Sequence, residues 1–306
     1  MKAIVFDNYK DKFDKINEYL NVEKINFESI RFRNGEGKIV IKGNTFNEDI
    51  IIFSDFNNSK EYTYLNKKRN YSKDEYYVEL KRVISAIDKA KSISVFLPLM
   101  YESRQNANKK LESKDFLMFV SDLKNMGVDN IVTFELHGNH QDVKSYSLSP
   151  LLREFNYDIV VSPDEGGVER SKKYSEVLKC DNKHFMKIRD LNSFIDGANP
   201  IEKYDSDNCD FKNKNVLIVD DILDSGETLI KALEIIEGAK KVDIFVAYPL
   251  FLKGVKKFKE MIKKNKLNKI YISDLISIDK RILKCKFIEV IDTSKLISDI
   301  LIEVIK

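Results

Sequence analysis

The chain has 306 residues, of which 43% are hydrophobic and 33% charged, so it has enough apolar material for two domains of ordinary size. Its 52 basic and 49 acidic residues leave a net charge of +3, which gives no indication of nucleic-acid or membrane binding. No apolar run approaches the roughly 20 residues of a membrane span, and the chain opens on a strand pattern rather than a signal peptide. Three widely spaced cysteines favour reduced thiols over disulfides or a zinc site. We therefore expect a soluble cytoplasmic protein.

Short apolar runs that predict strands alternate with helical patterns along the chain. The predicted strands are 3–6, 38–41, 50–53, 93–97, 130–134, 157–161, 216–219, 242–247 and 269–272. The predicted helices are 76–90, 115–126, 169–178, 229–237, 255–264 and 294–305. This alternation is typical of α/β proteins, in which helices cover both faces of a parallel sheet. Pro150 separates two halves that both show it, so we expect an N-terminal domain over residues 1–150 and a C-terminal domain over residues 151–306.

The first segment with chemical content is residues 31–36, Arg-Phe-Arg-Asn-Gly-Glu. Asn34-Gly35 is a strong turn signal between two strand-like runs, so these residues by themselves predict a β-hairpin. Residues 57–74 follow the next predicted strand; they are polar and rich in Tyr and Lys, and they predict a loop or flap.

Residues 94–110 begin as an apolar strand that ends at Pro98 and continue as a basic, amide-rich loop. Arg104 and Gln105 lie in this loop, and guanidinium and amide donors suit a polyphosphate. A solvated surface loop explains the same residues equally well.

Three further segments place polar groups near the ends of predicted strands. His137 stands just past the strand at 130–134, where a buried core histidine is the simpler explanation. Asp164 precedes a glycine pair and a predicted helix, so it either faces a ligand or caps that helix. Lys187 and Arg189 flank one residue of an extended segment, which lets both side chains face one pocket.

The most informative segment is residues 215–236, in which an apolar β-branched strand is followed by Asp220 and Asp221, a polar loop and a helical pattern. A loop with one glycine at a helix start presents N–H groups to a phosphate. Two carboxylates would repel that phosphate unless they bind sugar hydroxyls or a hard cation such as Mg²⁺. The segment therefore predicts a site for a sugar phosphate with a metal; the alternative is an ordinary strand–turn–helix whose acids cap the helix. The loop consists of Asp224, Ser225, Gly226, Glu227 and Thr228.

This segment resembles the phosphoribosyl pyrophosphate (PRPP) binding motif shared by phosphoribosyltransferases and ribose-phosphate pyrophosphokinases. The resemblance implies that Asp220 and Asp221 hold the ribose hydroxyls and that the loop at 224–228 cradles the 5-phosphate. By itself, the motif leaves two reaction classes open, transfer of a base and synthesis of PRPP.

The other segments resemble motifs of the ribose-phosphate pyrophosphokinase family in the family's order, and together they cover nearly the whole chain. The resemblance implies an α/β fold with two phosphoribosyltransferase-like domains, each a mainly parallel sheet flanked by helices. The chain departs from the family pattern at Asn106 and Ala107, at Glu135 and at Ile188. We identify it as a divergent member, with a Lys-, Asn- and Ile-rich composition typical of AT-rich bacterial or viral genomes.

The family resemblance implies a role for each matching residue. Lys187 and Arg189 are the expected catalytic cations, and His137 and Asp164 would serve the metals. The ribose phosphate would be bound by Asp220, Asp221 and the loop at 224–228. The expected ATP-binding residues are Phe32, Asn34, Glu36, Arg104, Gln105 and His137.

The expected reaction is Mg²⁺-dependent transfer of the diphosphoryl group of ATP to the C1 hydroxyl of ribose 5-phosphate, giving PRPP and AMP. Because adenine sites of the family are built across subunits, the resemblance also implies a homo-oligomer, a dimer or a hexamer. Two alternatives stay open. One is the same transfer to ADP-ribose in a viral pathway that rebuilds NAD; the other is a non-catalytic regulatory subunit of a PRPP synthetase.

Overall fold

The computed structural model describes residues 1–105, 111–189, 201–205 and 210–305, and for 186–189 and 201–205 it describes the backbone alone. The chain divides into two compact units. Unit 1 comprises residues 1–146, 275–277 and 293–306; unit 2 comprises residues 147–274 and 278–292. The domain boundary that the sequence predicts near residue 150 stays a prediction. Among the described residues, no helix is long and apolar enough to cross a membrane.

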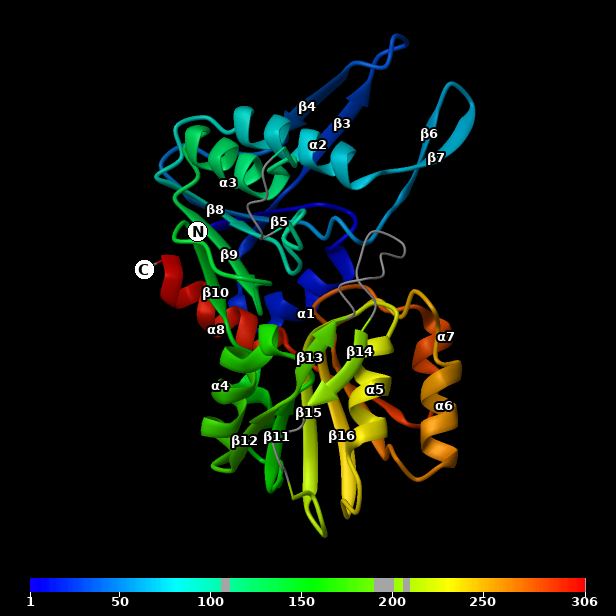
Figure 1. The fold of residues 1–306 in the computed structure, drawn as a ribbon. Coiled ribbons are helices and arrows are strands. Elements are labelled where there is room, and N and C mark those ends of the chain that lie inside the picture. Colours follow the sequence, from blue (N-terminus) through cyan, green and yellow to red (C-terminus); the bar gives the residue numbers. More distant parts are fainter. Residues whose placement is uncertain (106–110, 190–200, 206–209, 306) are drawn as a thin grey trace. The chain divides into compact units, whose positions relative to one another are not determined.

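Unit 1 is built on a six-stranded, all-parallel sheet in the order β10-β9-β8-β5-β1-β2 (Figure 1). Its central strands read as continuous apolar runs because both faces are covered, and residues 50–53 are fully buried. The strands are β1 (Lys2–Val5), β2 (Glu23–Ile25), β5 (Asp49–Phe53), β8 (Ser92–Phe96), β9 (Asn130–Phe134) and β10 (Val143–Tyr146).

Helices lie on both faces of this sheet because successive side chains of a strand point to opposite sides. Ile52 belongs to the core cluster that also holds the buried residues of α2 and α3, whereas Phe53 packs against Phe13 of α1 with ring centroids 4.9 Å apart. A capping box formed by Ser72 and Glu75 starts α2. The helices of unit 1 are α1 (Lys10–Leu20), α2 (Lys73–Ser85), α3 (Asp115–Asn125) and α8 (Ser294–Ile305).

Two antiparallel hairpins extend unit 1 beyond its parallel sheet (Figure 1). The first, β3 (Phe27–Arg31) with β4 (Gly37–Ile41), has the Asn-Gly turn that the sequence predicts. The second, β6 (Glu61–Tyr64) with β7 (Lys67–Asn70), lies within the segment for which the sequence predicts only a loop or flap.

Unit 2 is also built on a six-stranded, all-parallel sheet, in the order β12-β11-β15-β16-β17-β18. Ile244 and Val246 of β16 face the core that holds buried residues of α5 and α6, whereas Phe245 contacts Tyr174 of α4 on the other face. The strands are β11 (Ile159–Ser162), β12 (Asp181–His184), β15 (Asn215–Leu223), β16 (Lys241–Pro249), β17 (Lys269–Ser273) and β18 (Ile288–Ile291). The helices are α4 (Val168–Leu178), α5 (Glu227–Ile235), α6 (Lys256–Lys263) and α7 (Lys280–Leu283).

A short antiparallel ribbon, β13 (Met186–Arg189) with β14 (Ile201–Asp205), follows β12 in the chain (Figure 1). With the two parallel sheets it completes a fold of the predicted class, two mainly parallel sheets each flanked by helices.

Each parallel sheet has a point at which the strand order reverses. In unit 1 the chain runs from β1 outward to β2 and then continues from β5 in the opposite direction, and in unit 2 the reversal lies between β11 and β15. Ligands of open α/β sheets bind in the crevice outside the carboxyl ends of the strands at such a point. A ligand site is therefore expected at the carboxyl edge of each sheet.

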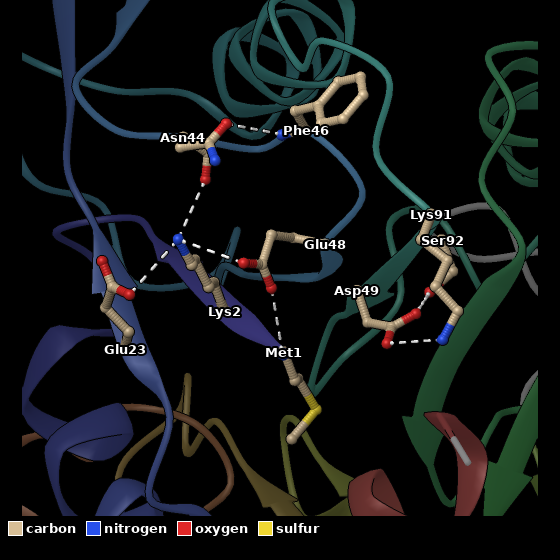
Figure 2. Close-up of polar contacts among 9 residues, drawn as sticks. All are labelled: Met1, Lys2, Glu23, Asn44, Phe46, Glu48, Asp49, Lys91 and Ser92. Atoms are coloured by element: carbon tan, nitrogen blue, oxygen red, sulfur yellow. Dashed lines mark hydrogen bonds and ion pairs between the residues drawn. The ribbon is translucent and has the colours of Figure 1, made fainter.

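The opposite, amino edge of the unit 1 sheet is tied together by charges (Figure 2). The Lys2 ammonium group lies 3.4 Å from carboxylates of both Glu23 and Glu48. Asp49 pairs with Lys91 at 3.2 Å and accepts a hydrogen bond from the Ser92 hydroxyl at 2.7 Å. These contacts join β1, β2, β5 and β8 at the end of the sheet away from any predicted site residue, so they serve the fold.

Candidate active site

The reversal point of the unit 2 sheet brings together three acidic residues that the sequence predicts to be functional. Asp164 follows β11, and Asp220 and Asp221 lie in β15, its neighbour in the sheet. The sequence predicts that this strand ends at Val219, but β15 continues to Leu223 because Asp220 pairs with Val246 of β16 and the pairing goes on past it. The two acids are therefore held by a sheet rather than by a free loop.

Arg170 of α4 balances this acid pair. Its Nη2 lies 2.7 Å from Oδ2 of Asp221, and its Nη1 lies 3.9 Å from Oδ1 of Asp220. The side chains of Arg170 and Asp221 are 10% and 7% exposed, so the pair is shielded from water. The carboxylates also accept backbone hydrogen bonds, from the N–H of Asp221 to Asp220 at 2.9 Å and from the N–H of Ile222 to Asp221 at 2.8 Å.

One arginine does not neutralise three neighbouring acids, so the charges around Asp220 disfavour its ionised form. Burial and the charge of Asp221 raise the pKa of Asp220 well above its ordinary value; Arg170 opposes the shift and Asp164 adds to it. A ligand that brings hydroxyl donors or positive charge to this edge would favour the ionised carboxylate. Ribose hydroxyls and Mg²⁺ are both such ligands.

The residues at this edge fit a magnesium ion of the kind that substrates help to hold. Mg²⁺ is commonly bound by one or two carboxylates together with waters and substrate phosphates. Asp164 and Asp220 offer such carboxylates, whereas Asp221 makes the shorter contact with Arg170, at 2.7 Å against 3.9 Å for Asp220. Among the described residues no group of three or more His, Cys, Asp or Glu side chains could hold a metal by itself. His137, the other predicted metal residue, belongs to unit 1 and Asp164 to unit 2.

The loop between β15 and α5 has the backbone form expected of a phosphate site. Gly226 adopts a φ of +77° as the N-cap residue of α5, and a Cβ atom there would lie 2.7 Å from the ring of Phe258. The segment after β16 fixes the loop, because the N–H of Leu252 donates to the Asp224 carbonyl at 2.9 Å and Lys253 pairs with Glu227 at 2.8 Å. The first N–H groups of α5, which an α-helix leaves without intrahelical acceptors, thus open onto this loop.

The capping explanation for these acids does not hold in the structure. The N-cap residue of α5 is Gly226 rather than either aspartate, and the Ser225 hydroxyl accepts a hydrogen bond from the N–H of Glu227 at 3.4 Å. Asp164 likewise makes no capping hydrogen bond to the short 3-10 turn that it precedes.

The predicted catalytic cations lie in β13, which the sequence correctly describes as extended. Lys187 pairs with Tyr204 and Arg189 with Ile201, with a register shift between Ile188 and Arg189. Their side chains lie outside the described part of the structure, so their roles stay predictions.

Unit 1 holds the predicted ATP-binding residues in two places. Arg104 and Gln105 follow β8 and His137 follows β9; these strands are parallel neighbours, so both segments leave the same carboxyl edge. The Gln105 amide donates to Asp115 at 3.0 Å and accepts from the Asp115 N–H at 3.1 Å, and it thereby fixes the start of α3. The divergent positions Asn106 and Ala107 lie outside the described residues.

Phe32, Asn34 and Glu36 form the turn of the β3–β4 hairpin. The strands of this hairpin pair with each other and form a two-stranded sheet of their own, separate from the parallel sheet. The N–H of Phe32 donates to the Glu36 carbonyl at 2.8 Å, and the Asn34 side chain accepts from the Glu36 N–H at 3.2 Å. Asn34 therefore shapes the turn, and the exposed ring of Phe32 is available for contact.

Comparisons with known proteins decide the family. Residues 1–127 match the family model described as the N-terminal domain of ribose phosphate pyrophosphokinase, and residues 140–276 match the one described as the phosphoribosyl transferase domain. The chain belongs to the ribose-phosphate pyrophosphokinase family.

Relatives of the family match along most of the chain. The ribose-phosphate pyrophosphokinase of Agrobacterium fabrum is 26% identical over 98% of this chain and 95% of its own, and that of Mycoplasma genitalium is 26% identical over 98% and 91%. The enzyme of Pyrococcus abyssi is 27% identical over 60% of this chain and 67% of its own. The crystal structure of phosphoribosylpyrophosphate synthetase from Mycobacterium smegmatis shares the fold, with a TM-score of 0.76, 19% identity, and coverage of 99% and 98%.

The sequence-based prediction assigned no role to two groups of polar residues that the structure brings together. Arg170 lies in the segment that resembles the family, and its spacing of three residues from the glycine pair was the only available signal. At the reversal point of unit 1, Asn8 donates to the Asp55 carbonyl at 2.8 Å and accepts from the Ser54 hydroxyl at 3.2 Å. Polar residues directly after two apolar strand runs are the signal that could have found this network.

Proposed function

We propose that this member of the ribose-phosphate pyrophosphokinase family transfers the diphosphoryl group of ATP to the C1 hydroxyl of ribose 5-phosphate, giving PRPP and AMP. In this reaction the C1 oxygen attacks the β-phosphorus and its proton is lost. The bond from that phosphorus to the α–β bridging oxygen breaks, and AMP leaves. The proposal includes ATP and ribose 5-phosphate as substrates and Mg²⁺ as the metal.

The observation that carries the proposal is the arrangement at the reversal point of the unit 2 sheet. Asp220 and Asp221 stand in β15, and the Gly226 loop leads from the end of the same strand into α5. Carboxylates suited to the ribose hydroxyls are thus followed, within one strand–turn–helix, by backbone N–H groups suited to a phosphate. A five-carbon sugar with a terminal phosphate presents both features.

Positioning and charge neutralisation would carry most of the catalysis, because the chemistry of diphosphoryl transfer requires little else from the protein. Asp220 and Asp221 would orient the ribose, and the loop at 224–228 would anchor its phosphate. Lys187 and Arg189 would stabilise charge on the transferring group. Mg²⁺, when bound, would neutralise charge on the polyphosphate, with Asp164 and Asp220 as its carboxylate partners in unit 2 and His137 as the predicted partner in unit 1.

The ADP-ribose alternative draws no support from the comparisons, in which the relatives carry the name of ribose-phosphate pyrophosphokinase. The acceptor is therefore tested directly. The protein is incubated with ATP and Mg²⁺, and AMP release is compared with ribose 5-phosphate and with ADP-ribose. We expect AMP with ribose 5-phosphate; AMP with ADP-ribose alone would replace the proposed acceptor.

A regulatory subunit would behave differently when Lys187 is changed. We expect Lys187→Ala to lower the rate of AMP release by on the order of 10²–10³, the usual effect of removing a group that stabilises transition-state charge. Lys183→Ala on the adjoining strand β12 is the matched control, because its side chain is exposed and has no proposed role. Normal stimulation of a PRPP synthetase by a protein that itself releases no AMP would favour the regulatory alternative.

A further inference from the structure

The loop at 224–228 has an unfavourable charge for a phosphate site. It carries two carboxylates, Asp224 and Glu227, and no basic residue. Glu227 is the first residue of α5, so its carboxylate and a bound phosphate would both be stabilised by the positive end of the same helix. Two negative charges that share this position repel each other. A loop of this sequence therefore needs a cation from elsewhere in the chain to hold a phosphate tightly.

Lys253 brings such a cation to the loop. Its ammonium group donates a hydrogen bond to Oε1 of Glu227 at 2.8 Å. This contact, together with the charges of Lys257 and Lys231, holds the pKa of Glu227 below its ordinary value, although partial burial opposes the shift. Glu227 is therefore ionised at neutral pH, and Lys253 cancels its charge at close range.

The backbone around Lys253 is fixed to the strand and the loop that carry the site. Its segment leads from β16 into α6, the helix beside α5 (Figure 1). The N–H of Phe251, a residue that is 5% exposed, donates to the Leu223 carbonyl at 2.9 Å. The N–H of Leu252 donates to the Asp224 carbonyl, also at 2.9 Å. The base of the lysine side chain is thus held beside the loop, which makes its contact with the glutamate a built feature.

We propose that Glu227 competes with the phosphate of the substrate for the start of α5, and that Lys253 sets the affinity of the loop for this phosphate by cancelling the glutamate charge. The two side chains are 50% and 63% exposed, and exposed ion pairs contribute little to folding stability. The pair therefore acts on the ligand rather than on the fold. The inference rests on the proposed function, since it takes this loop as the site of the ribose phosphate.

The test measures phosphate binding apart from catalysis, in a cycle of two substitutions. Ribose 5-phosphate and inorganic phosphate are titrated calorimetrically into the wild type, Lys253→Met, Glu227→Gln and the double variant. We expect Lys253→Met to raise the Kd for both ligands about tenfold, because the glutamate charge is then uncompensated. Glu227→Gln should bind both ligands at least as tightly as the wild type. The double variant should regain the wild-type Kd to within about threefold, since the repelling charge is absent.

Three further measurements distinguish this electrostatic effect from a structural one. Lys253→Arg keeps the positive charge and should stay close to the wild type. The penalty of Lys253→Met should shrink between about 50 mM and about 500 mM salt, because salt screens exposed charges. In steady-state assays Lys253→Met should raise the KM for ribose 5-phosphate and leave kcat unchanged, since the repulsion acts equally on the ground state and the transition state.

The matched control is Lys295→Met in unit 1. It removes the cation of another exposed ion pair, in which Lys295 and Asp299 lie 2.7 Å apart and are 68% and 57% exposed. This variant has no proposed role in binding and should bind ribose 5-phosphate as the wild type does.

The outcomes separate this inference from the proposed function. Unchanged Kd values in Lys253→Met would overturn the inference, even if the wild type releases AMP with ribose 5-phosphate. If the double variant bound as weakly as Lys253→Met, the lysine would contact the phosphate itself, and the inference would again be overturned. The expected pattern of Kd values in a protein that releases no AMP from any acceptor would uphold the inference and refute the proposed reaction. A wild type that binds neither ligand would overturn both.

Discussion

Arg170 links two elements at the reversal point of the unit 2 sheet, because it reaches from α4 to an aspartate of β15. Removing one partner of a buried ion pair leaves an uncompensated charge, which costs roughly 3–5 kcal/mol. We expect Arg170→Met to lower the free energy of unfolding by that amount in urea titrations. Adding Asp221→Asn should restore much of the loss, since the orphaned charge is then absent.

The control for this prediction is an exposed pair of the same type. Arg281 and Asp279 lie 2.5 Å apart, but the arginine side chain is 88% exposed, so Arg281→Met should leave stability almost unchanged. If Arg170→Met alone and the double variant lost the same stability, Asp221 would not be the group that Arg170 balances.

Asp55 gives unit 1 a dependence on pH. Burial raises the pKa of Asp55 from 3.8 to about 6, although the backbone N–H groups of Asn57 and Ser277 oppose the shift by donating to its carboxylate. The folded state therefore holds this proton more tightly than the unfolded state. The resulting stabilisation is fully present below pH 3.8 and is lost as the pH rises through 6, a change of about 3 kcal/mol.

The variant Asp55→Asn isolates this effect, because other titrating groups cancel in the comparison with the wild type. We expect the difference in unfolding free energy between the two proteins to shift in favour of the variant as the pH rises from 4 to 7. If the difference in unfolding free energy between the two proteins stayed constant over this pH range, Asp55 would titrate near its ordinary pKa in the folded protein.

Among the elements, the turn from β15 into α5 depends most on one residue type. An alanine at Gly226 would have to adopt a φ of +77° and place its Cβ 2.7 Å from the Phe258 ring. Backbone strain of this kind costs of the order of 1–3 kcal/mol, and the collision would move the loop at 224–228. We expect Gly226→Ala to raise the KM for the ribose phosphate and to lower the melting temperature.

Gly127 provides the matched control, because it has a φ of +85° but a Cβ atom added there would meet no described atom within 4 Å. Gly127→Ala should therefore show the strain without the collision, and without a change in the KM for the ribose phosphate. Equal KM values for the two variants would show that the loop does not need the close approach of Phe258.

The parallel strands and their helices could be predicted because the signal is local. Apolar runs such as 50–53 and 216–219 are buried on both faces, and the helix over residues 294–305 has the bounds that its pattern predicts. The extension of β15 past Asp220 could not be predicted, since it depends on pairing with β16, a strand that begins about 20 residues later. The β6–β7 hairpin was missed for a related reason: its exposed strands bury no apolar face, so they carry no hydrophobic alternation.

For the candidate site, too, the positions near strand ends could be predicted from the sequence, whereas contacts between distant residues could not. Asp164 follows β11, Asp220 lies in the last residues of β15 and the Gly226 loop follows that strand; a parallel sheet brings such positions to one edge. The pairing of Arg170 with Asp221 spans 51 residues and depends on how α4 packs on the sheet, which no local pattern encodes. Lys187 and Arg189 lie on the predicted extended segment, and their catalytic roles stay predictions.

At the scale of the whole molecule, the two units repeat one architecture with different edges. Both sheets have six parallel strands and one reversal point. In unit 2 that point holds an acid pair followed by the Gly226 loop, whereas in unit 1 it holds the Asn8–Asp55 network. The differences therefore lie in the residues that follow the strands, and these residues decide what each unit can bind.

The packing of α8 with α1 sets an order for folding during synthesis. Lys12 of α1 donates to the Ser294 hydroxyl at 2.9 Å, and residues 293–306 belong to unit 1 although they are synthesised after the whole of unit 2. The last residue of unit 2 is 292, so all strands of unit 2 can pair before α8, the helix that packs against α1, has been synthesised. Unit 1, whose parallel sheet is synthesised before unit 2, is thus completed after unit 2, when α8 can pack against α1.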